Sequence, residues 1–307
     1  MPMRINNEII INKVPKDTVF YPTNDFIFRR IFGTEGNEFI TQSFLSTIIP
    51  DKITSISLAN NVELTRDNIN DKYGILDVKA TLNDNIKCDI EMQVSENPAM
   101  TNRIMYYWAK LFSEEFKKSE KYDKLKRTII ILILNYQDNL ISLIPKIYTT
   151  WHIREDDFSK IQLTNMLEFH IISLPKLEAL SIEKQKNIQS NYIDISSRLT
   201  LCSWMKFITN PNILEDSDMS NKGIKEATEQ YNKLTQDEIE QDLAWRRAMA
   251  IADEKAIKDT AYNDGKAEGI KEANIEIAKK MLKSNKTISE IVEFTELSED
   301  EINKLKE

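Results

Sequence analysis

Two short segments in the first third of the chain alternate apolar and polar residues, which is the period of a β-strand with one buried face. They cover residues 76–82 and 86–94. Between them lie Asn83, Asp84 and Asn85, residue types that favour turns. The pattern therefore predicts a β-hairpin with this Asn-Asp-Asn sequence as its loop.

The alternation also selects the register of the hairpin. On one face the apolar partners are Leu76 with Met92, Val78 with Ile90, Ala80 with Cys88 and Leu82 with Ile86. The other face pairs Asp77 with Glu91 and Lys79 with Asp89. A shift by one residue would set Asp77 against Ile90, so the hydrophobic pattern disfavours any other register.

Asp77 and Glu91 form the chemically informative pair. Directly opposed Cβ atoms lie roughly 5 Å apart, so two carboxylates there repel by on the order of 3 kcal/mol at an effective dielectric of about 20. A divalent metal turns this repulsion into coordination, and Mg²⁺ favours one or two carboxylates with waters and phosphate oxygens. The alternative is a solvated sheet face on which Lys79, opposite Asp89, balances the charge.

The segments around the hairpin predict helices and further strands. A capped helix is expected over residues 24–33 and another over residues 97–116. Residues 128–135 form an unbroken β-branched run of the kind buried on both faces of a sheet. Residues 147–153 and 166–172 read as strands that widen this sheet. The order is helix, strands, acid-bearing hairpin, helix and central strand.

The C-terminal part has a helical pattern. Residues 191–209 predict a helix, and the polar stretch that follows it predicts a linker. Residues 222–283 are rich in Glu, Lys and Ala and, after Gly223 at their start, contain only Gly265 and Gly269 as breakers, which favours long helix. The apolar positions do not keep a heptad, so a coiled coil, a helical extension and a hairpin all stay open. We place the domain boundary near residue 215, giving an α/β domain over 1–215 and a helical region over 216–307.

The last segment, residues 287–302, predicts two short helices that meet at Leu297, with Ser298 as a cap. This resembles the start of a helix-turn-helix. However, its outer positions are strongly acidic, and Glu296 stands where such motifs usually have glycine. A packing or oligomerisation unit is therefore favoured over a DNA reader.

Composition narrows the classes of function. With 307 residues, 41% of them hydrophobic, the chain can bury a sizeable core. No apolar run approaches the ~20 residues needed to cross a bilayer, and no secretory region begins the chain, so we expect no membrane partner and a cytoplasmic location. Cys88 and Cys202 are expected to be reduced core thiols. His152 and His170 are the only histidines, so neither a zinc cluster nor a serine–histidine triad is supported.

The order of the elements resembles the PD-(D/E)XK nuclease superfamily and, more narrowly, the Rpn family of recombination-promoting nucleases, also named transposases. The motifs that carry the resemblance lie at residues 24–29, 74–77, 89–93 and 103–108. The similarity covers about residues 20 to 210 and extends more loosely into the C-terminal helices. It implies an α/β fold with a mixed central sheet flanked by helices, followed by an α-helical C-terminal region.

The resemblance implies a metal site at the hairpin. Asp77 and Glu91 would hold Mg²⁺, or Mn²⁺ in its place, together with the main-chain carbonyl of Met92. Asp25, on the first helix, would be an additional acid near the metal. These oxygen ligands suit a hard divalent cation.

Gln93 departs from the superfamily pattern, which usually has lysine at this position. A glutamine can orient a water or bond a phosphate oxygen, but it supplies no positive charge for the transition state. Lys79 lies on the same strand face and would lend that charge. Arg103 and Tyr106, on the second helix, would contact the DNA backbone, where most protein–DNA hydrogen bonds go.

The implied activity is metal-dependent endonucleolytic hydrolysis of DNA, linked to recombination or mobile elements, by a homo-oligomer that is expected to be a dimer. One alternative is a catalytically inactive nuclease-fold protein that binds nucleic acid or a protein partner. Another is a helical assembly protein with a structural N-terminal domain. The pair Asp77 and Glu91 favours activity, whereas Gln93 and the net charge of −8 favour the alternatives.

Overall fold

The computed structural model describes residues 14–15, 18–59, 78–114, 121–177 and 195–305. It divides the chain into two compact units, Met1–Ala250 and Ile251–Glu307. The larger unit contains the sheet and most of the helices, and the smaller unit is helical. The two units are described separately below.

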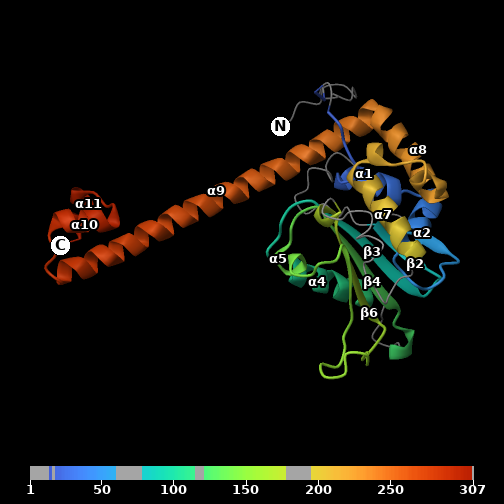
Figure 1. Cartoon of the computed structure of the whole chain (residues 1–307), viewed down its shortest axis with the longest axis horizontal. Helices are drawn as coiled ribbons and strands as arrows, with labels where there is room; N and C mark the ends of the chain where they lie inside the picture. Colours follow the sequence, from blue (N-terminus) through green and yellow to red (C-terminus); the bar gives the residue numbers. More distant parts are fainter. Residues whose placement is uncertain (1–13, 16–17, 60–77, 115–120, 178–194, 306–307) are drawn as a thin grey trace, which may run out of the picture. The chain divides into compact units, whose positions relative to one another are not determined.

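A mixed sheet forms the centre of the larger unit (Figure 1). In spatial order its strands are β1 (Ile56–Leu58), β2 (Val78–Leu82), β3 (Ile86–Gln93), β4 (Arg127–Leu134), β6 (Leu167–Ser173) and β5 (Tyr148–Trp151). The strands β3, β4 and β6 are parallel, while β1, β2 and β5 pair antiparallel at the two edges. The central run predicted from β-branched residues is β4, buried along nearly its whole length.

The predicted hairpin register is confirmed for every described pair. Val78 lies opposite Ile90, Lys79 opposite Asp89, Ala80 opposite Cys88 and Leu82 opposite Ile86. Asn83 and Asp84 adopt φ of 49° and 61°, which asparagine and aspartate tolerate better than other side chains. The other two predicted pairs, Leu76 with Met92 and Asp77 with Glu91, lie outside the described residues.

Helices cover both faces of the sheet (Figure 1). The helices α1 (Asp25–Phe32), α2 (Glu38–Leu45) and α7 (Ile195–Thr209) contribute to the larger apolar cluster on one face. The other face packs against α4 (Met100–Ser113) and the short α5 (Asn139–Ser142). These helices confirm the predicted order of elements.

The helix α1 shows why its sequence forms a helix at this place. The Asn24 side chain accepts hydrogen bonds from the backbone N–H groups of Phe26 and Ile27, and the helix ends at Gly33 as predicted. Its apolar residues are buried in the larger cluster, where the ring of Phe32 packs against that of Trp204 with centroids 5.6 Å apart. Burial of one face therefore fixes α1 against the sheet.

The long helical segment breaks at a residue that the sequence did not single out. The helix α8 (Lys222–Gln236) ends and α9 (Glu238–Lys283) begins around Asp237, whose carboxylate accepts hydrogen bonds from the backbone N–H groups of Ile239 and Glu240. Gly265 and Gly269 instead lie inside α9. An N-capping aspartate therefore outweighs two exposed glycines in deciding where the chain turns.

The position of α8 also bears on the domain boundary. The sequence predicted a division near residue 215, whereas the larger compact unit extends to Ala250 because α8 packs against α1 and α2. Compactness does not test whether residues 1–215 alone carry the function. The division of roles between 1–215 and 216–307 stays a prediction.

The smaller unit contains the two predicted short helices, α10 (Ile288–Thr295) and α11 (Glu299–Lys304). Each begins with a capping box, Thr287 with Glu290 and Ser298 with Glu301. Glu296 ends α10 in a left-handed conformation with φ of 54°. A small apolar cluster of Ala278, Ile291, Leu297 and Ile302 holds these helices against the end of α9.

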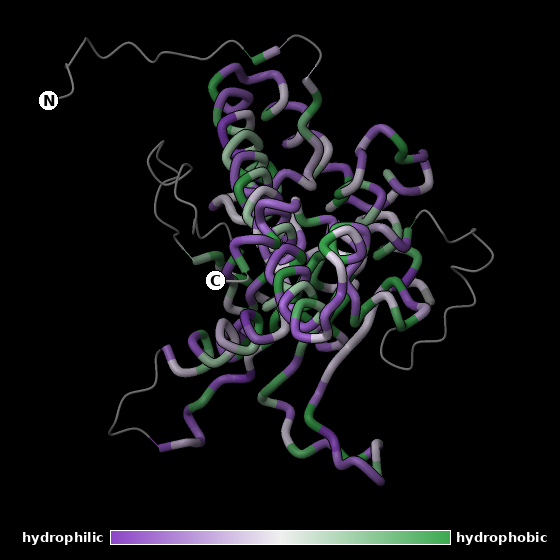
Figure 2. Tube along the Cα trace, turned by 90° about the vertical axis from the view of Figure 1, so that its left-hand side faces the viewer, coloured by the Kyte–Doolittle hydropathy of each residue, from purple (hydrophilic) through white to green (hydrophobic). Residues whose placement is uncertain are grey.

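Apolar and polar residues are interleaved along the chain (Figure 2). In the described part of the chain, no helix has the length and apolar character required to span a bilayer.

Cys88 is buried and Cys202 is half-buried, and both are free thiols. Burial raises the pKa of Cys88 well above its usual value, and Asp89 and Glu168 raise it further.

Candidate functional site

The strand β3 presents charged residues to the face of the sheet that α4 covers. Its apolar residues Cys88 and Ile90 point into the larger cluster, so the alternate residues Lys87, Asp89 and Glu91 point toward α4. All three are nearly buried, and the Lys87 ammonium donates to the backbone carbonyl of Leu111 in α4 at 3.1 Å. This face is therefore enclosed, and the alternative of a solvated sheet face does not apply to β3.

Arg103 reaches Glu91 from α4. Its Nη2 lies 3.0 Å from Oε1 of Glu91, and its Nε donates to the Tyr107 hydroxyl at 2.8 Å. The guanidinium also lies 5.1 Å from the centroid of the Tyr107 ring. Glu91 is only 3% exposed, whereas the Arg103 side chain is 36% exposed, so one cation connects a buried carboxylate with the surface.

The remaining hairpin residues of the prediction are only partly brought together. Lys79 lies opposite Asp89 and is half-buried. Gln93 ends β3, and its amide nitrogen donates to the backbone carbonyl of Ser95 at 3.2 Å. Met92 is buried, with its side chain in the larger cluster. Asp77 lies outside the described residues.

Asp25 has a different partner from the predicted metal. It begins α1 and is nearly buried, and Arg247 of α9 binds its carboxylate, with Nε–Oδ2 and Nη2–Oδ2 distances of 2.9 and 2.7 Å. Sequence reasoning missed Arg247 because it lies in a charged helix more than two hundred positions away. The role of Asp25 as a metal ligand stays a prediction.

Tyr106 points outward from α4 and is 63% exposed, and its contact with DNA stays a prediction. The neighbouring aromatic residues have structural contacts. The Trp108 indole donates to the backbone carbonyl of Thr128 at 3.1 Å and stacks on Phe112 with centroids 4.7 Å apart. These contacts show that Trp108 packs between α4 and the sheet.

The end of the sheet near Glu91 carries a concentration of negative charge. Burial and the neighbouring carboxylates, Asp138 first, then Glu96 and Glu91, raise the pKa of Tyr136 to about 12. Such a field favours a bound cation. Among the described residues, no group of three or more His, Cys, Asp or Glu side chains converges to form a complete metal site.

The residues that are present fit a hard divalent metal in chemical kind. Asp89 and Glu91 are buried carboxylates on one strand face, and backbone carbonyls such as that of Met92 add oxygen ligands. Glu91 would be a ligand, with Arg103 close to the ion.

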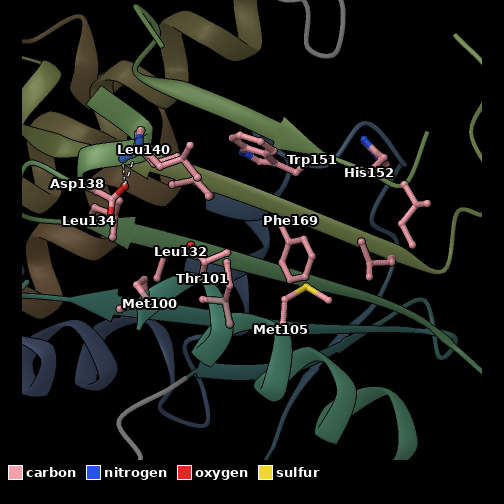
Figure 3. Close-up of a pocket in the computed structure, with 15 residues that line it drawn as sticks. Met100, Thr101, Met105, Leu132, Leu134, Asp138, Leu140, Trp151, His152 and Phe169 are labelled. Carbon is pink, nitrogen blue, oxygen red and sulfur yellow. Dashed lines mark hydrogen bonds between the residues drawn. The ribbon is translucent and has the colours of Figure 1, made fainter. Parts of the chain in front are cut away.

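An apolar cavity of about 280 Å³ lies on the same sheet face beside α4 (Figure 3). Its wall includes Met100, Met105, Leu132, Trp151 and Phe169. Its carboxylate, Asp138, already accepts hydrogen bonds from the backbone N–H groups of Leu140 and Ile141 and caps α5. With so few polar groups, this cavity does not suit a metal or a phosphate, and the candidate site is the region around Glu91.

A second buried glutamate lies on β6 and was not singled out by sequence. Glu168 accepts hydrogen bonds from Arg127 Nη2 at 2.5 Å and His170 Nε2 at 2.6 Å. The Nδ1 atom of His170 lies 2.6 Å from the Tyr148 hydroxyl. The only sequence feature that indicated this network is the spacing of Glu168 and His170, two residues apart in a predicted strand and so on the same face.

Comparisons with known proteins agree with the geometry. Residues 22–261 match the family model described as the PD-(D/E)XK nuclease family transposase. Searches of curated proteins and of solved structures each gave no match. The matched segment includes α1, the whole described sheet, α4, α7, α8 and the first part of α9. The chain therefore belongs to the PD-(D/E)XK nuclease family transposases.

Proposed function

We propose that this protein is a Mg²⁺-dependent DNA endonuclease that also accepts Mn²⁺ and acts in recombination or the movement of mobile elements. The observation that carries the proposal is the buried carboxylate of Glu91, which lies on the enclosed face of β3 and forms an ion pair with Arg103 of α4. A buried carboxylate with a partly exposed cationic partner is typical of a functional site, although structural ion pairs also occur.

Asp77 and Glu91 would hold the metal, together with the main-chain carbonyl of Met92. The hairpin register runs without a break to Val78 and Ile90, and one further pair would bring Asp77 opposite Glu91. Asp25 would add an acid once Arg247 releases it. A bound metal lowers the pKa of its water and orients a phosphodiester group.

The chain's own residues supply the other parts of the reaction. Gln93, at the end of β3, would orient the attacking water through its amide, and Lys79 would lie on the same face as a positive charge. Arg103 and Tyr106 would contact the DNA backbone from α4. In this proposal the phosphate would lie between the acidic strand face and this helix.

The C-terminal region would serve assembly. Residues 216–307 include the long α9 and the capped helices of the smaller unit, and we propose that they support a homodimer in the cytoplasm. Light scattering of the full chain and of a chain ending near residue 250 tests this role. If both chains form particles with the same number of subunits, the proposed assembly role of residues 216–307 is wrong.

Plasmid cleavage tests the proposed activity. The purified protein should nick or linearise supercoiled DNA with Mg²⁺ or Mn²⁺, and EDTA should stop the reaction. Asp77→Asn should abolish cleavage, whereas Asp84→Asn, the same change in the turn of the same hairpin, should cut at the parent rate. Cleavage that persists in EDTA, or an active Asp77→Asn, would remove the mechanism.

A second candidate follows from Gln93. A chain without the usual lysine is also consistent with a nuclease-fold protein that binds nucleic acid or a protein partner without cleaving. The same experiment separates the two functions, because that protein would shift DNA in a gel and leave the plasmid intact with either metal.

A further inference from the structure

The site requires a positive charge that Gln93 does not provide. The negative charge that develops on a phosphate during hydrolysis is stabilised by a cation placed beside it. At neutral pH the Gln93 side chain is uncharged, and its amide nitrogen donates to the backbone carbonyl of Ser95. Another residue near Glu91 must carry the charge if the chain cleaves DNA.

Two cations lie near this face, and their positions differ. Lys79 is on β2, directly opposite Asp89. Arg103 is on α4 and contacts the predicted metal ligand itself, with Nη2 at 3.0 Å from Glu91. Arg103 therefore contacts the predicted metal ligand directly, whereas the register pairs Lys79 with Asp89, two residues before Glu91 on β3.

The contacts of Arg103 orient its guanidinium. The Tyr107 hydroxyl accepts from Nε at 2.8 Å, and its ring lies beneath the guanidinium. Residues 103 and 107 are one helical turn apart, so α4 itself keeps the two side chains together. With Nε occupied, the two terminal nitrogens form the fork that binds carboxylate and phosphate groups in a bidentate manner.

We propose that Arg103 is the cation that replaces the missing lysine, and that it has two alternative partners. Without metal it pairs with Glu91. When a divalent ion binds Glu91, the ion competes with the guanidinium for the same carboxylate, and Arg103 turns to the phosphate of bound DNA. This inference rests on the proposed function and assigns Tyr107 as a positioning residue.

The environment of the pair permits this exchange. Arg103 is over a third exposed, so its guanidinium can leave Glu91 and remain hydrated or meet a ligand. Glu91 is buried and stays on β3. The metal and the arginine are therefore coupled: each weakens the binding of the other to Glu91, and this coupling is reciprocal.

Titration of Mn²⁺ into the full chain without DNA tests the competition. Arg103→Met removes the competing cation, so Mn²⁺ should bind more tightly by roughly fivefold or more. Lys110→Met makes the same charge change on the exposed side of α4 and should leave the affinity within about twofold of the parent. Unchanged or weaker Mn²⁺ binding by a folded Arg103→Met variant would overturn the competition.

DNA affinity measured with Ca²⁺ and with EDTA tests the second partner, and neither condition requires cleavage. With Ca²⁺, Arg103→Met should weaken binding of a short duplex by roughly tenfold or more, because a charged hydrogen bond to phosphate is lost. With EDTA the same variant should bind like the parent, because Arg103 is then held by Glu91. An equal loss in both conditions would mean an ordinary phosphate contact and would overturn the exchange.

Variants of the same pair control for structural damage. Tyr107→Phe should give a smaller change in the same direction in both assays, because Arg103 keeps its charge but loses its orienting acceptor. Arg103→Lys should restore much of the metal-dependent DNA affinity. If the parent fails to cut DNA at all, the proposed function fails, while the two binding assays still decide whether Arg103 exchanges partners.

Discussion

Glu91 and Glu168 are two buried glutamates of one sheet, and they differ in what holds them. Glu168 is bound by Arg127 and by His170, which is itself buried and hydrogen bonded to Tyr148. Glu91 pairs with Arg103, which stands at the surface of α4. The side-chain exposure of the two arginines, 17% for Arg127 and 36% for Arg103, expresses the difference.

The comparison concerns how each carboxylate is held in the fold. The charge of Glu168 is balanced by Arg127 and by the buried His170, and this network joins β4, β5 and β6. The partner of Glu91 is more exposed, which is what the proposed exchange of Arg103 requires. Burial of a charge alone is therefore weak evidence for a site, and a buried carboxylate with an exposed partner is the better candidate.

The largest expected effect is the loss of activity in Glu91→Gln. Removing a metal ligand should lower the cleavage rate by about a thousandfold, which corresponds to about 4 kcal/mol of transition-state stabilisation. The unfolding free energy should change by no more than about 1 kcal/mol, because Arg103 can turn to solvent. Plasmid cleavage and urea unfolding measure the two quantities, and a fully active variant would contradict the assignment.

Glu168→Ala should give the opposite result. Removing the carboxylate leaves Arg127 and His170 without their shared acceptor, and breaking a buried pair in this way costs about 3–5 kcal/mol. The loss should appear in the urea midpoint, with the cleavage rate per folded molecule unchanged. If Glu168→Ala is as stable as the parent but no longer cleaves DNA, then Glu168 acts in cleavage and the assignment is wrong.

Tyr148→Phe should have a smaller effect of the same kind. It removes the hydroxyl that lies 2.6 Å from His170 and 3.3 Å from the backbone carbonyl of Ile48. The expected loss of stability is about 1 kcal/mol, typical of one buried hydrogen bond, with no loss of cleavage. An unchanged unfolding midpoint would show that the hydrogen bond between the Tyr148 hydroxyl and His170 does not stabilise the fold.

The smallest effect concerns pH and His152, whose Nε2 lies 3.7 Å from Glu168. Burial lowers the pKa of His152 below its usual value, and the negative charge of Glu168 opposes this shift only in part. The unfolded chain therefore binds a proton first, so stability should be complete above about pH 6.5 and should decrease as the pH falls below it. In His152→Gln, the unfolding free energy measured with urea should change less with pH than in the parent. If it changes with pH as much as in the parent, His152 is not the group responsible.

Local patterns were sufficient to predict most of the fold. The alternation around residues 83–85 gave the hairpin register, and the β-branched run gave β4. The capping residues Asn24 and Ser298 marked helix starts that the structure contains. These signals succeed because hydrogen bonds within a few residues and one buried face determine the local structure.

Contacts between distant charged residues could not be predicted in the same way. The pairing of Asp25 with Arg247, and of Glu168 with Arg127, depends on which of many similar side chains the fold brings together. The ion pair of Arg103 with Glu91 likewise depends on the rotation of α4 over β3. For the candidate site, sequence therefore predicted the residues of β3 and α4 but not the contact between them.

Binding of Mn²⁺ to three proteins tests the central claim most directly: the parent, Glu91→Gln and Glu168→Gln. Titration followed by electron paramagnetic resonance should show a site in the parent and in folded Glu168→Gln, and should show it lost in Glu91→Gln. If Glu91→Gln binds Mn²⁺ as tightly as the parent, the carboxylate on β3 is not a metal ligand and the account of the active site is wrong.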